Sequence, residues 1–206
     1  MSATLLLARH GQTVWHAENR YAGVSEVPLT DEGRDQARRL GRWAARTPID
    51  AIWTSTVSRA IVTAEPAAMA LNLVPQREYD LRECDFGVME GRTLAEFASE
   101  QPEAAAAFTA DPVAHPFPAA EDPRVAALRG AAALRRIARE HDGARVLVVA
   151  HNTLLRLVLC ELLSLPLRNY RRTFPALRNT AVSEIRLGHD LGHDECALLS
   201  LNVPCG

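Results

Sequence analysis

The feature that most constrains this chain is a short apolar run, Leu5 to Ala8, which ends abruptly in Arg9, His10 and Gly11. A run of this length bounded by polar residues is typical of a strand that is buried on both faces of a sheet. In open α/β sheets, ligands bind beyond the carboxyl ends of the strands. A glycine at that point lets the backbone turn sharply or approach a ligand closely. We therefore expect Arg9 and His10 to emerge from the sheet where a functional site would form.

The composition limits the classes of protein to consider. The 206 residues, 48% of them hydrophobic and 23% charged, suit one globular domain spanning residues 1–206. The net charge of −2 provides no general attraction to nucleic acid or to an acidic membrane surface. No apolar run is long enough to span a bilayer or to form a secretory signal. We expect a cytoplasmic protein without nucleic-acid or membrane partners and with four free thiols. A homodimer is compatible with the sequence, which does not fix the oligomeric state.

Apolar periodicity predicts strands and helices that alternate along the chain, as in an α/β fold with a mostly parallel central sheet. After the first strand, the predicted elements are a helix from an N-cap at Thr30 to near Pro48, a strand over 51–54, a helix over 55–71, a strand near 72–76, a short helix capped by Thr93 and ending at Glu100, a helix over 128–141, a strand over 145–150, a helix over 152–163, and closing strands over 181–187 and 197–203. Pro66 is expected to kink or interrupt the second helix.

Two segments differ from this alternation. Residues 101–123 hold five prolines and an alanine run, which predicts an irregular cover or lid rather than a framework element. Residues 189–195 carry His, Asp and Glu side chains that are compatible with a metal. The glycine within that segment and its charge favour an exposed hairpin, so no metal site is predicted there.

A second histidine stands in the same sequence context as His10. His151 directly follows residues 145–150, which form the clearest buried strand in the chain. A lone histidine at a strand end is more often structural than functional. Two such histidines at the same edge of a parallel sheet can share one pocket, and Arg9 stands beside the first. The pair therefore favours a functional site.

Two other segments carry residues that suit an anion site. Arg59 stands near the start of the helix that follows the second strand, where unpaired amides and a guanidinium together favour an anion. A solvated surface arginine is the alternative. Residues 81–91 form a loop that holds Glu83, Asp85 and Glu90. Loop carboxylates are usually only solvated, so this loop is weak evidence by itself.

Taken in this order, the Arg-His-Gly signature, the Ser-x-x-x-Arg-Ala-x-x-Thr-Ala segment at 55–64 and the histidine after a strand resemble branch 1 of the histidine phosphatase superfamily, which is phosphoglycerate-mutase-like, and its small phosphatases in particular. The resemblance covers residues 5 to about 187. It implies a three-layer α/β/α sandwich and catalysis through a phosphohistidine, without a metal or another cofactor. By this resemblance His10 matches the nucleophile and Glu83 the proton donor, with Asp85 as the reserve candidate. Arg9, Arg59 and His151 match the phosphate pocket.

The chemistry of these side chains agrees with the resemblance. The oxygens of a phosphoryl group in transfer need cationic or hydrogen-bonding partners, which two arginines and a histidine supply. A nucleophilic imidazole must be neutral, with its tautomer fixed by a bond to the other ring nitrogen, and a backbone carbonyl near Gly11 is the expected partner. A partly enclosed carboxyl with a raised pKa can protonate the departing alkoxide.

Departures from the family pattern bear on the substrate. His16 stands where many relatives carry an asparagine, and Ala22-Gly23 stands where cofactor-dependent mutases have a threonine and a glycine. The longer basic insertion of those mutases is also missing. Asn152 replaces the glycine that more often follows the second histidine, and Glu121 stands in an altered Pro-Gly-Gly-Glu-Ser motif. We expect these positions to affect substrate binding. The full set predicted to bind substrate or phosphate is Arg9, Gln12, His16, Gly23, Arg59, Glu83, His151 and Asn152.

The sequence therefore predicts a metal-independent phosphatase acting on a small phosphorylated metabolite. Two alternatives remain open, a cofactor-dependent phosphoglycerate mutase and an inactive phospholigand-binding domain. The presence of the whole residue set argues against the inactive domain. The sequence does not identify the substrate, and residues 101–123 carry no readable specificity pattern.

Overall fold

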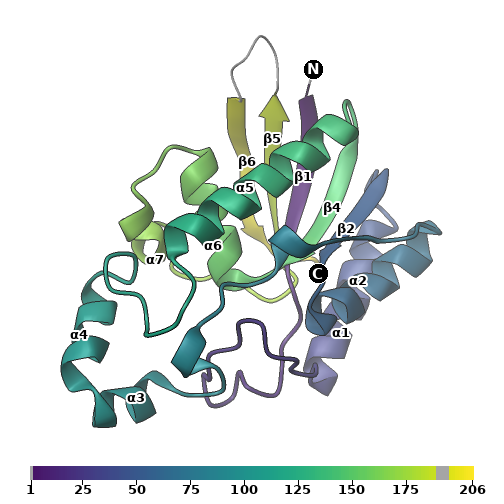
Figure 1. Cartoon of the computed structure of the whole chain (residues 1–206). Coiled ribbons are helices and arrows are strands. Elements are labelled where there is room, and N and C mark those ends of the chain that lie inside the picture. Colours follow the sequence, from purple (N-terminus) through teal and green to yellow (C-terminus); the bar gives the residue numbers. More distant parts are fainter. Residues whose placement is uncertain (1, 189–194) are drawn as a thin grey trace.

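A six-stranded mixed sheet forms the centre of the computed structural model, which describes residues 2–188 and 195–206 (Figure 1). The strands are β1 (Ser2–Arg9), β2 (Ala51–Ser55), β3 (Gln76–Glu78), β4 (Arg145–Ala150), β5 (Val182–Gly188) and β6 (Glu195–Val203). They lie in the order β3-β2-β4-β1-β5-β6. The first four in this order pair in parallel, whereas β5 runs antiparallel to both β1 and β6. Because β1 and β4 are parallel neighbours, their carboxyl ends deliver His10 and His151 to the same edge.

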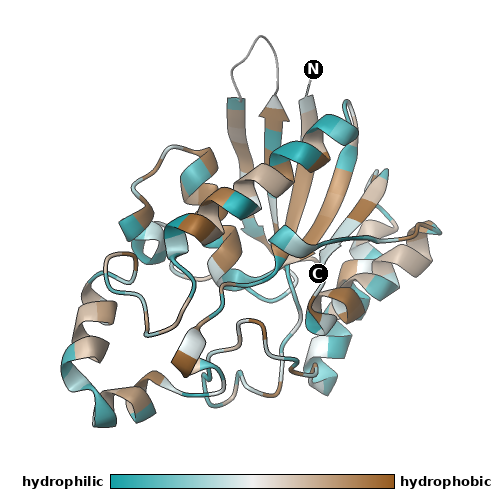
Figure 2. Cartoon of the chain, in the orientation of Figure 1, coloured by the Kyte–Doolittle hydropathy of each residue, from teal (hydrophilic) through white to brown (hydrophobic). Residues whose placement is uncertain are grey.

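Helices cover both faces of the sheet and make three layers. Helices α1 (Asp31–Ala44) and α2 (Ser58–Leu71) pack on one face, and α5 (Pro123–Glu140) and α6 (Asn152–Leu162) pack on the other. Side chains of β1 alternate between the layers: Leu5 and Leu7 join the core under α5 and α6, while Leu6 and Ala8 join the core under α1 and α2. Figure 2 shows the apolar strands between helices whose outer faces are hydrophilic. The three-layer α/β/α sandwich predicted from the sequence is confirmed.

Most predicted elements are present, with their ends shifted by a few residues. The Thr30 hydroxyl caps α1 by accepting from the Gly33 amide, as expected. The short α3 (Leu94–Glu100) begins with a capping box between Thr93 and Glu96.

The predicted strand near 72–76 is displaced to Gln76–Glu78. Asn72 takes a left-handed conformation (φ 54°) that ends α2, and Pro75 cannot donate to a sheet, so pairing starts only after it.

Pro66 does not interrupt α2, because the helix continues through this residue to Leu71. The proline lies in a close contact with α1: a Cβ added to Gly41 would approach the Pro66 Cβ to 2.9 Å. Tertiary packing at this point outweighs the tendency of proline to disrupt the interior of a helix.

Residues 101–123, which were predicted to form an irregular cover, contain a regular helix. Helix α4 (Pro102–Ala110) occupies the first half of this segment, because a proline suits the first turn of a helix and the alanines that follow favour helix strongly. Helices α3 and α4 lie beyond the carboxyl end of the sheet, while α7 (Tyr170–Thr173) lies beside α6 (Figure 1). Three short 3-10 turns complete the chain at Tyr79–Leu81, Gly87–Met89 and Leu167–Asn169.

Two predictions concern membranes and metals. Among the described residues, no helix is both long and apolar enough to cross a membrane. The predicted hairpin at 189–195 lies outside the described residues except for Glu195, which begins β6.

Candidate active site

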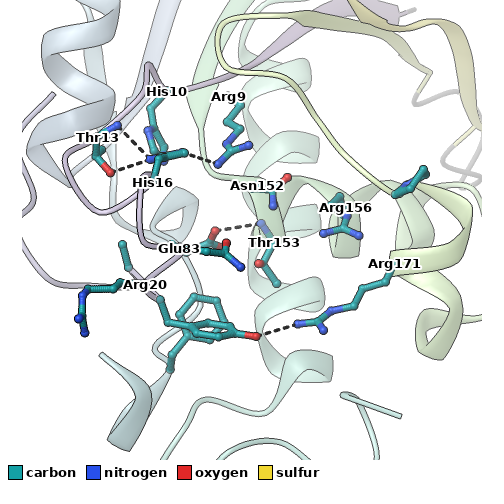
Figure 3. A pocket seen from close by; sticks show the side chains of 15 residues that line it. Arg9, His10, Thr13, His16, Arg20, Glu83, Asn152, Thr153, Arg156 and Arg171 are labelled. Carbon is teal, nitrogen blue, oxygen red and sulfur yellow. Dashed lines mark hydrogen bonds between the residues drawn. The ribbon is translucent and has the colours of Figure 1, made fainter. Parts of the chain in front are cut away.

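A cavity of about 370 Å³ opens at the carboxyl ends of β1 and β4 (Figure 3). Five of the predicted site residues line it directly: Arg9, His10, His16, Glu83 and Asn152. The lining is completed by Thr13, Asn19, Arg20, Tyr21, Ala22, Phe86, Thr153, Arg156, Arg171 and Pro175. Segments that are far apart in sequence thus converge on the point predicted for chemistry.

His10 follows β1 and is almost fully buried, with 5% of its surface exposed. Its Nδ1 lies 2.7 Å from the carbonyl oxygen of Gly11, to which it donates in the neutral ring, as expected from the sequence. Nε2 therefore carries the lone pair, and the Nε–H of Arg59 donates to it over 3.2 Å. Burial and then the charges of Arg59 and Arg9 hold the pKa of His10 well below its ordinary value. The result is a neutral imidazole with a defined tautomer, whose Nε2 lone pair faces Arg59.

The turn after His10 is held against α2 by Thr63. The amide of Gly11 donates to the Thr63 hydroxyl over 3.0 Å, and that hydroxyl donates to the carbonyl of Arg59 over 2.6 Å. A Cβ on Gly11 would lie 2.5 Å from the carbonyl oxygen of Gly33, so only glycine fits this approach to α1. One hydroxyl thus fixes the backbone of the histidine turn relative to the arginine helix.

The Arg59 guanidinium is held by the loop that crosses above it. Only 1% of Arg59 is exposed, and its terminal nitrogens donate to the carbonyls of Ser25, Ala22 and Gly23 over 2.9, 3.0 and 2.6 Å. Burial lowers the pKa of Arg59, an effect that the charge of Glu83 opposes. These bonds fix the plane of the guanidinium and direct its Nε–H at His10.

Arg9 and His16 form the next part of the pocket. The Nη1 of Arg9 donates to the carbonyl of Leu177 over 2.8 Å, and its Nη2 lies 2.6 Å from the Nε2 of His16. Because a guanidinium can only donate, Nε2 of the neutral His16 ring accepts and Nδ1 donates to the Thr13 hydroxyl over 2.8 Å. Burial and then the Arg9 charge lower the pKa of His16 to about 4, and burial lowers the pKa of Arg9 to about 10. At neutral pH the site therefore pairs a cation with a neutral imidazole.

His151 lies behind His10, with the ring centroids 5.2 Å apart. Its Nε2 lies 2.8 Å from the hydroxyl of Ser55, which also accepts from the Val57 amide. Its Nδ1 is buried and has no hydrogen-bond partner among the described residues. Burial and the Arg59 charge hold the pKa of His151 well below its ordinary value.

Glu83 occupies the amino end of α6. Its carboxylate accepts from the amides of Thr153, Leu154 and Cys84 over 2.9, 2.7 and 3.0 Å. Its pKa is raised by burial, although these amide bonds oppose the shift. Glu83 is thus a buried carboxyl that lines the cavity and has a raised pKa, which are the properties of a proton donor.

Several predicted residues lie away from the cavity lining. Gln12 turns to the start of α1, where its side-chain oxygen accepts from the Thr30 hydroxyl over 2.9 Å. The amide of Gly23 donates to Glu90, and its carbonyl accepts from Arg59. Gln12 and Gly23 therefore bond to neighbouring segments of the protein and do not line the cavity. Asp85, the reserve proton donor, accepts from the amide of Gly87 and is also outside the lining.

Glu121, which was expected to affect substrate binding, lies outside the lining of this cavity and pairs with Arg129 over 2.6 Å. Arg129 also donates to the carbonyl of Glu83, so this ion pair supports the loop that carries Glu83. Asn152 does line the cavity, and its Oδ1 is buried without a hydrogen-bond partner among the described residues.

Four residues of the site were not singled out from the sequence. Ser55 and Thr63 stand in the segment quoted for the family resemblance, where small hydroxyl residues gave the only signal. Arg156 belongs to the predicted helix over 152–163, and Arg171 belongs to α7, for which no element was predicted. In the ranges 2–188 and 195–206, no group of three or more His, Cys, Asp or Glu side chains could hold a metal ion.

The sequence and the fold of this chain are similar to those of known proteins. Residues 5–203 match the family model described as histidine phosphatase superfamily (branch 1). The chain is 33% identical to "Probable phosphoglycerate mutase GpmB" of Salmonella typhi, over 87% of this chain and 82% of that one. It is 28% identical to "Phosphoserine phosphatase 1" of Hydrogenobacter thermophilus, over 81% and 79% of the two chains. Among solved structures, Bacillus stearothermophilus YhfR is similar with a TM-score of 0.88 and 30% identity, covering 98% of this chain and 97% of that one.

Proposed function

Because the chain belongs to branch 1 of the histidine phosphatase superfamily, we propose that it is a metal-independent phosphatase that hydrolyses a small-molecule phosphomonoester through a phosphohistidine on His10. The observation that carries the proposal is the His10 ring, which is neutral, has its Nδ1 held by the Gly11 carbonyl and turns its Nε2 toward Arg59. A similar cavity in a binding domain would not require a nucleophile with a fixed tautomer.

In the first step, the Nε2 lone pair attacks phosphorus and the bond from phosphorus to the ester oxygen breaks. The departing alkoxide takes a proton from the Glu83 carboxyl, whose raised pKa favours the protonated form that donates. His10 is left carrying the phosphoryl group, and Nδ1 remains bonded to Gly11, which stabilises the positive charge that develops on the ring.

The phosphoryl oxygens need donors throughout this step. Arg9 and Arg59 supply charged N–H groups. The Nε–H of Arg59 donates to Nε2 in the free site, and it would pass to a phosphoryl oxygen as the Nε2 lone pair turns to phosphorus. The buried Nδ1 of His151 has no described protein partner, so a phosphoryl oxygen would satisfy its hydrogen. In that tautomer, the Ser55 hydroxyl donates to Nε2 of His151.

In the second step, water attacks the phosphohistidine and the bond from phosphorus to Nε2 breaks. The Glu83 carboxylate takes a proton from the attacking water, which regenerates the acid for the next cycle. Inorganic phosphate leaves and His10 returns to the neutral form that its pKa favours.

Phosphoglycerate mutase activity is the second candidate, favoured by the relative of that name at 33% identity. A mutase would return the phosphoryl group to the substrate instead of to water. Conversion of 3-phosphoglycerate to the 2-isomer, stimulated by 2,3-bisphosphoglycerate and faster than release of phosphate, would establish this candidate over the phosphatase.

The proposed function is tested by release of phosphate from p-nitrophenyl phosphate by the wild-type chain and by His10→Ala. We expect the variant to lose at least about 10³-fold in kcat, because both steps pass through the missing ring. Arg136→Gln is a suitable control, since Arg136 lies outside the cavity and pairs with Glu78. Equal turnover by wild type and His10→Ala would refute the mechanism.

A further inference from the structure

Two arginines line the same cavity as His10, on the side formed by the helices α6 and α7. Arg156 belongs to α6 and Arg171 to α7, and Figure 3 shows both across the cavity from Arg9 and His10. The steps proposed above use neither side chain.

Arg156 is a buried cation without a protein counter-ion. It is 7% exposed, its Nε has no hydrogen-bond partner among the described residues, and its guanidinium lies 5.0 Å from the centre of the Tyr170 ring. Within the described part of the chain, no carboxylate lies within 4.0 Å of it. A buried cation in this state is unfavourable unless an anion joins it.

Arg171 is oriented by aromatic residues instead of by a carboxylate. Its Nε donates to the Tyr170 hydroxyl over 3.0 Å, and its Nη2 donates to the Tyr21 hydroxyl over 3.5 Å. Its guanidinium also stacks 4.6 Å above the Phe108 ring of α4. No ion pair joins it to a carboxylate of residues 2–188 or 195–206, and these contacts leave Nη1 available to a ligand.

Arginines elsewhere show that the chain readily provides counter-ions. Arg129 pairs with Glu121 at 2.6 Å, and Arg145 pairs with Glu184 at 2.9 Å. Arg20, another residue of the cavity lining, pairs with Glu18 and Glu96. Other arginines without a carboxylate partner among the described residues, such as Arg34, Arg42 and Arg178, are exposed to solvent, which screens their charge. Arg156 is buried and Arg171 half-buried at the cavity, so these two depend more on a ligand for neutralisation.

Neighbouring positive charges increase the need for an anion. The Arg171 charge contributes to the lowered pKa of Arg156, and the Arg156 charge contributes to the lowered pKa of Arg9. The phosphoryl group of a substrate would neutralise charge beside Arg9 and His10. It would leave Arg156 and Arg171 without a partner unless the substrate carried another oxyanion.

We infer that Arg156 and Arg171 form a subsite for a second oxyanion, so that the preferred substrate is a phosphomonoester that also carries a carboxylate or a second phosphoryl group. The inference rests on the proposed function in placing the first phosphoryl group at His10. Arginine suits this role because its planar guanidinium can give two parallel N–H bonds to a carboxylate or to a phosphoryl group.

The first test measures binding without turnover. The full chain carrying His10→Asn is titrated calorimetrically with two matched pairs of ligands: 3-phosphoglycerate against glycerol 3-phosphate, and fructose 1,6-bisphosphate against fructose 6-phosphate. The first pair differs by a carboxylate and the second by a phosphoryl group. We expect roughly ten- to hundredfold tighter binding of the more anionic ligand in at least one pair, the range typical of charge-assisted hydrogen bonds. The pair that shows this preference identifies the oxyanion.

The second test asks whether the two arginines cause the preference. Arg156→Gln and Arg171→Gln, each added to His10→Asn, should reduce it to less than about threefold, and Arg156→Lys should retain part of it. Arg136→Gln, which removes a paired arginine outside the cavity, should leave the preference intact. If thermal denaturation shows that Arg156→Gln is unfolded, Arg171→Gln and Arg156→Lys are used for the comparison, since Arg171 is only half-buried.

The outcomes separate this inference from the proposed function. Turnover of p-nitrophenyl phosphate by the wild-type chain, with no preference in either ligand pair, would overturn the subsite and leave the phosphatase intact. A preference that survives both glutamine variants would also overturn it. A preference that depends on the arginines, in a chain that hydrolyses none of the phosphate esters, would support the subsite and refute the phosphatase.

Discussion

The cavity has two walls that hold their arginines in different ways. The phosphate wall is lined by Arg9 and His10, with Arg59 and His151 buried against His10. Backbone carbonyls hold its guanidinia: three bind Arg59 and one binds Arg9. In the far wall, formed by Arg156 and Arg171, the partners found within residues 2–188 and 195–206 are all aromatic.

This difference suggests that the phosphate wall governs the reaction and that the far wall governs which substrate binds. Carbonyl bonds fix a guanidinium relative to the backbone, so the phosphate wall keeps its geometry before a substrate arrives. The far wall presents cations on helical side chains and leaves them to be neutralised by a ligand. Substitutions in the phosphate wall should therefore reduce turnover of every phosphate ester, whereas those in the far wall should change which esters are preferred.

The largest effect that sharpens this contrast is expected from Arg59→Lys. A lysine keeps the charge but cannot bond to three carbonyls and also direct an N–H at His10. We expect kcat for p-nitrophenyl phosphate to fall roughly hundredfold or more, the usual cost of removing a preorganised transition-state donor. Steady-state kinetics measure the loss. A change of less than about fivefold would mean that charge suffices and that the carbonyl bonds are not needed for turnover.

Glu83→Gln tests whether Glu83 donates the proton, independently of the residues that bind the phosphoryl group. We expect roughly hundredfold loss of kcat on an alkyl phosphate and a much smaller loss on p-nitrophenyl phosphate, whose phenolate leaves without a proton. The one oxygen of glutamine can still accept from the amides of Leu154 and Cys84, which share Oε1 of Glu83, and only the bond from the Thr153 amide is lost, so the fold should survive.

The pH profile on the alkyl phosphate gives the same residue a second test. Because the pKa of Glu83 is raised, turnover by the wild type should fall as the pH rises through that pKa and the acid is lost. His10 stays neutral well below its ordinary pKa, so activity should persist into acidic solution. A loss of similar size on both substrates, or a profile that glutamine leaves unchanged, would exclude Glu83 as the acid.

The contrast between the walls also explains what the sequence could predict. His10 and His151 each follow an uninterrupted buried strand, so apolar patterning and the sheet rule were enough to bring them together. The Gly11 carbonyl followed from the chemistry that a neutral nucleophile requires. Arg156 was missed because a helical pattern says which face is buried, and does not say that a buried arginine lacks a counter-ion. Arg171 was missed because no element was predicted for its segment, residues 170–173.

Other misses have the same cause, which is that contacts distant in sequence override local preferences. Pro66 remains helical because of its contact with Gly41, and Gln12 bonds to Thr30 of the next helix. The displacement of β3 depended on the left-handed turn at Asn72. The helix over Pro102–Ala110 was a different error, because the prolines were given more weight than the alanines between them.

Thr63→Val tests the link between His10 and Arg59 through stability. The variant leaves the Gly11 amide without its acceptor in a buried site, so we expect the free energy of unfolding to fall by about 1–3 kcal/mol. The matched control is Thr54→Val, since the buried Thr54 hydroxyl has no hydrogen-bond partner among the described residues. Urea denaturation of both variants gives the comparison. Equal stability of the two would show that the Thr63 bonds do not hold the turn.

The smallest effect is expected from His16→Asn, which restores the asparagine of many relatives. The folded ring binds its proton at about pH 4, while an unfolded histidine does so near 6.5. Between these values the unfolded state binds more protons, so acidification favours unfolding. Between pH 7.5 and 5 the wild type should lose about 1 kcal/mol more stability than the variant, an amount already reduced for the partial exposure of the ring. Parallel stability curves would contradict the lowered pKa.

The most direct test of the central claim is to trap the phosphoryl group on His10. A substrate labelled in its phosphoryl group is mixed with excess wild-type chain, quenched in base within a single turnover and digested for mass spectrometry. We predict a base-stable, acid-labile phosphoryl group on the peptide that contains His10, at Nε2, and none in His10→Asn. Full turnover of the substrate with no labelled protein at any quench time, or with the label on another residue, would contradict the account.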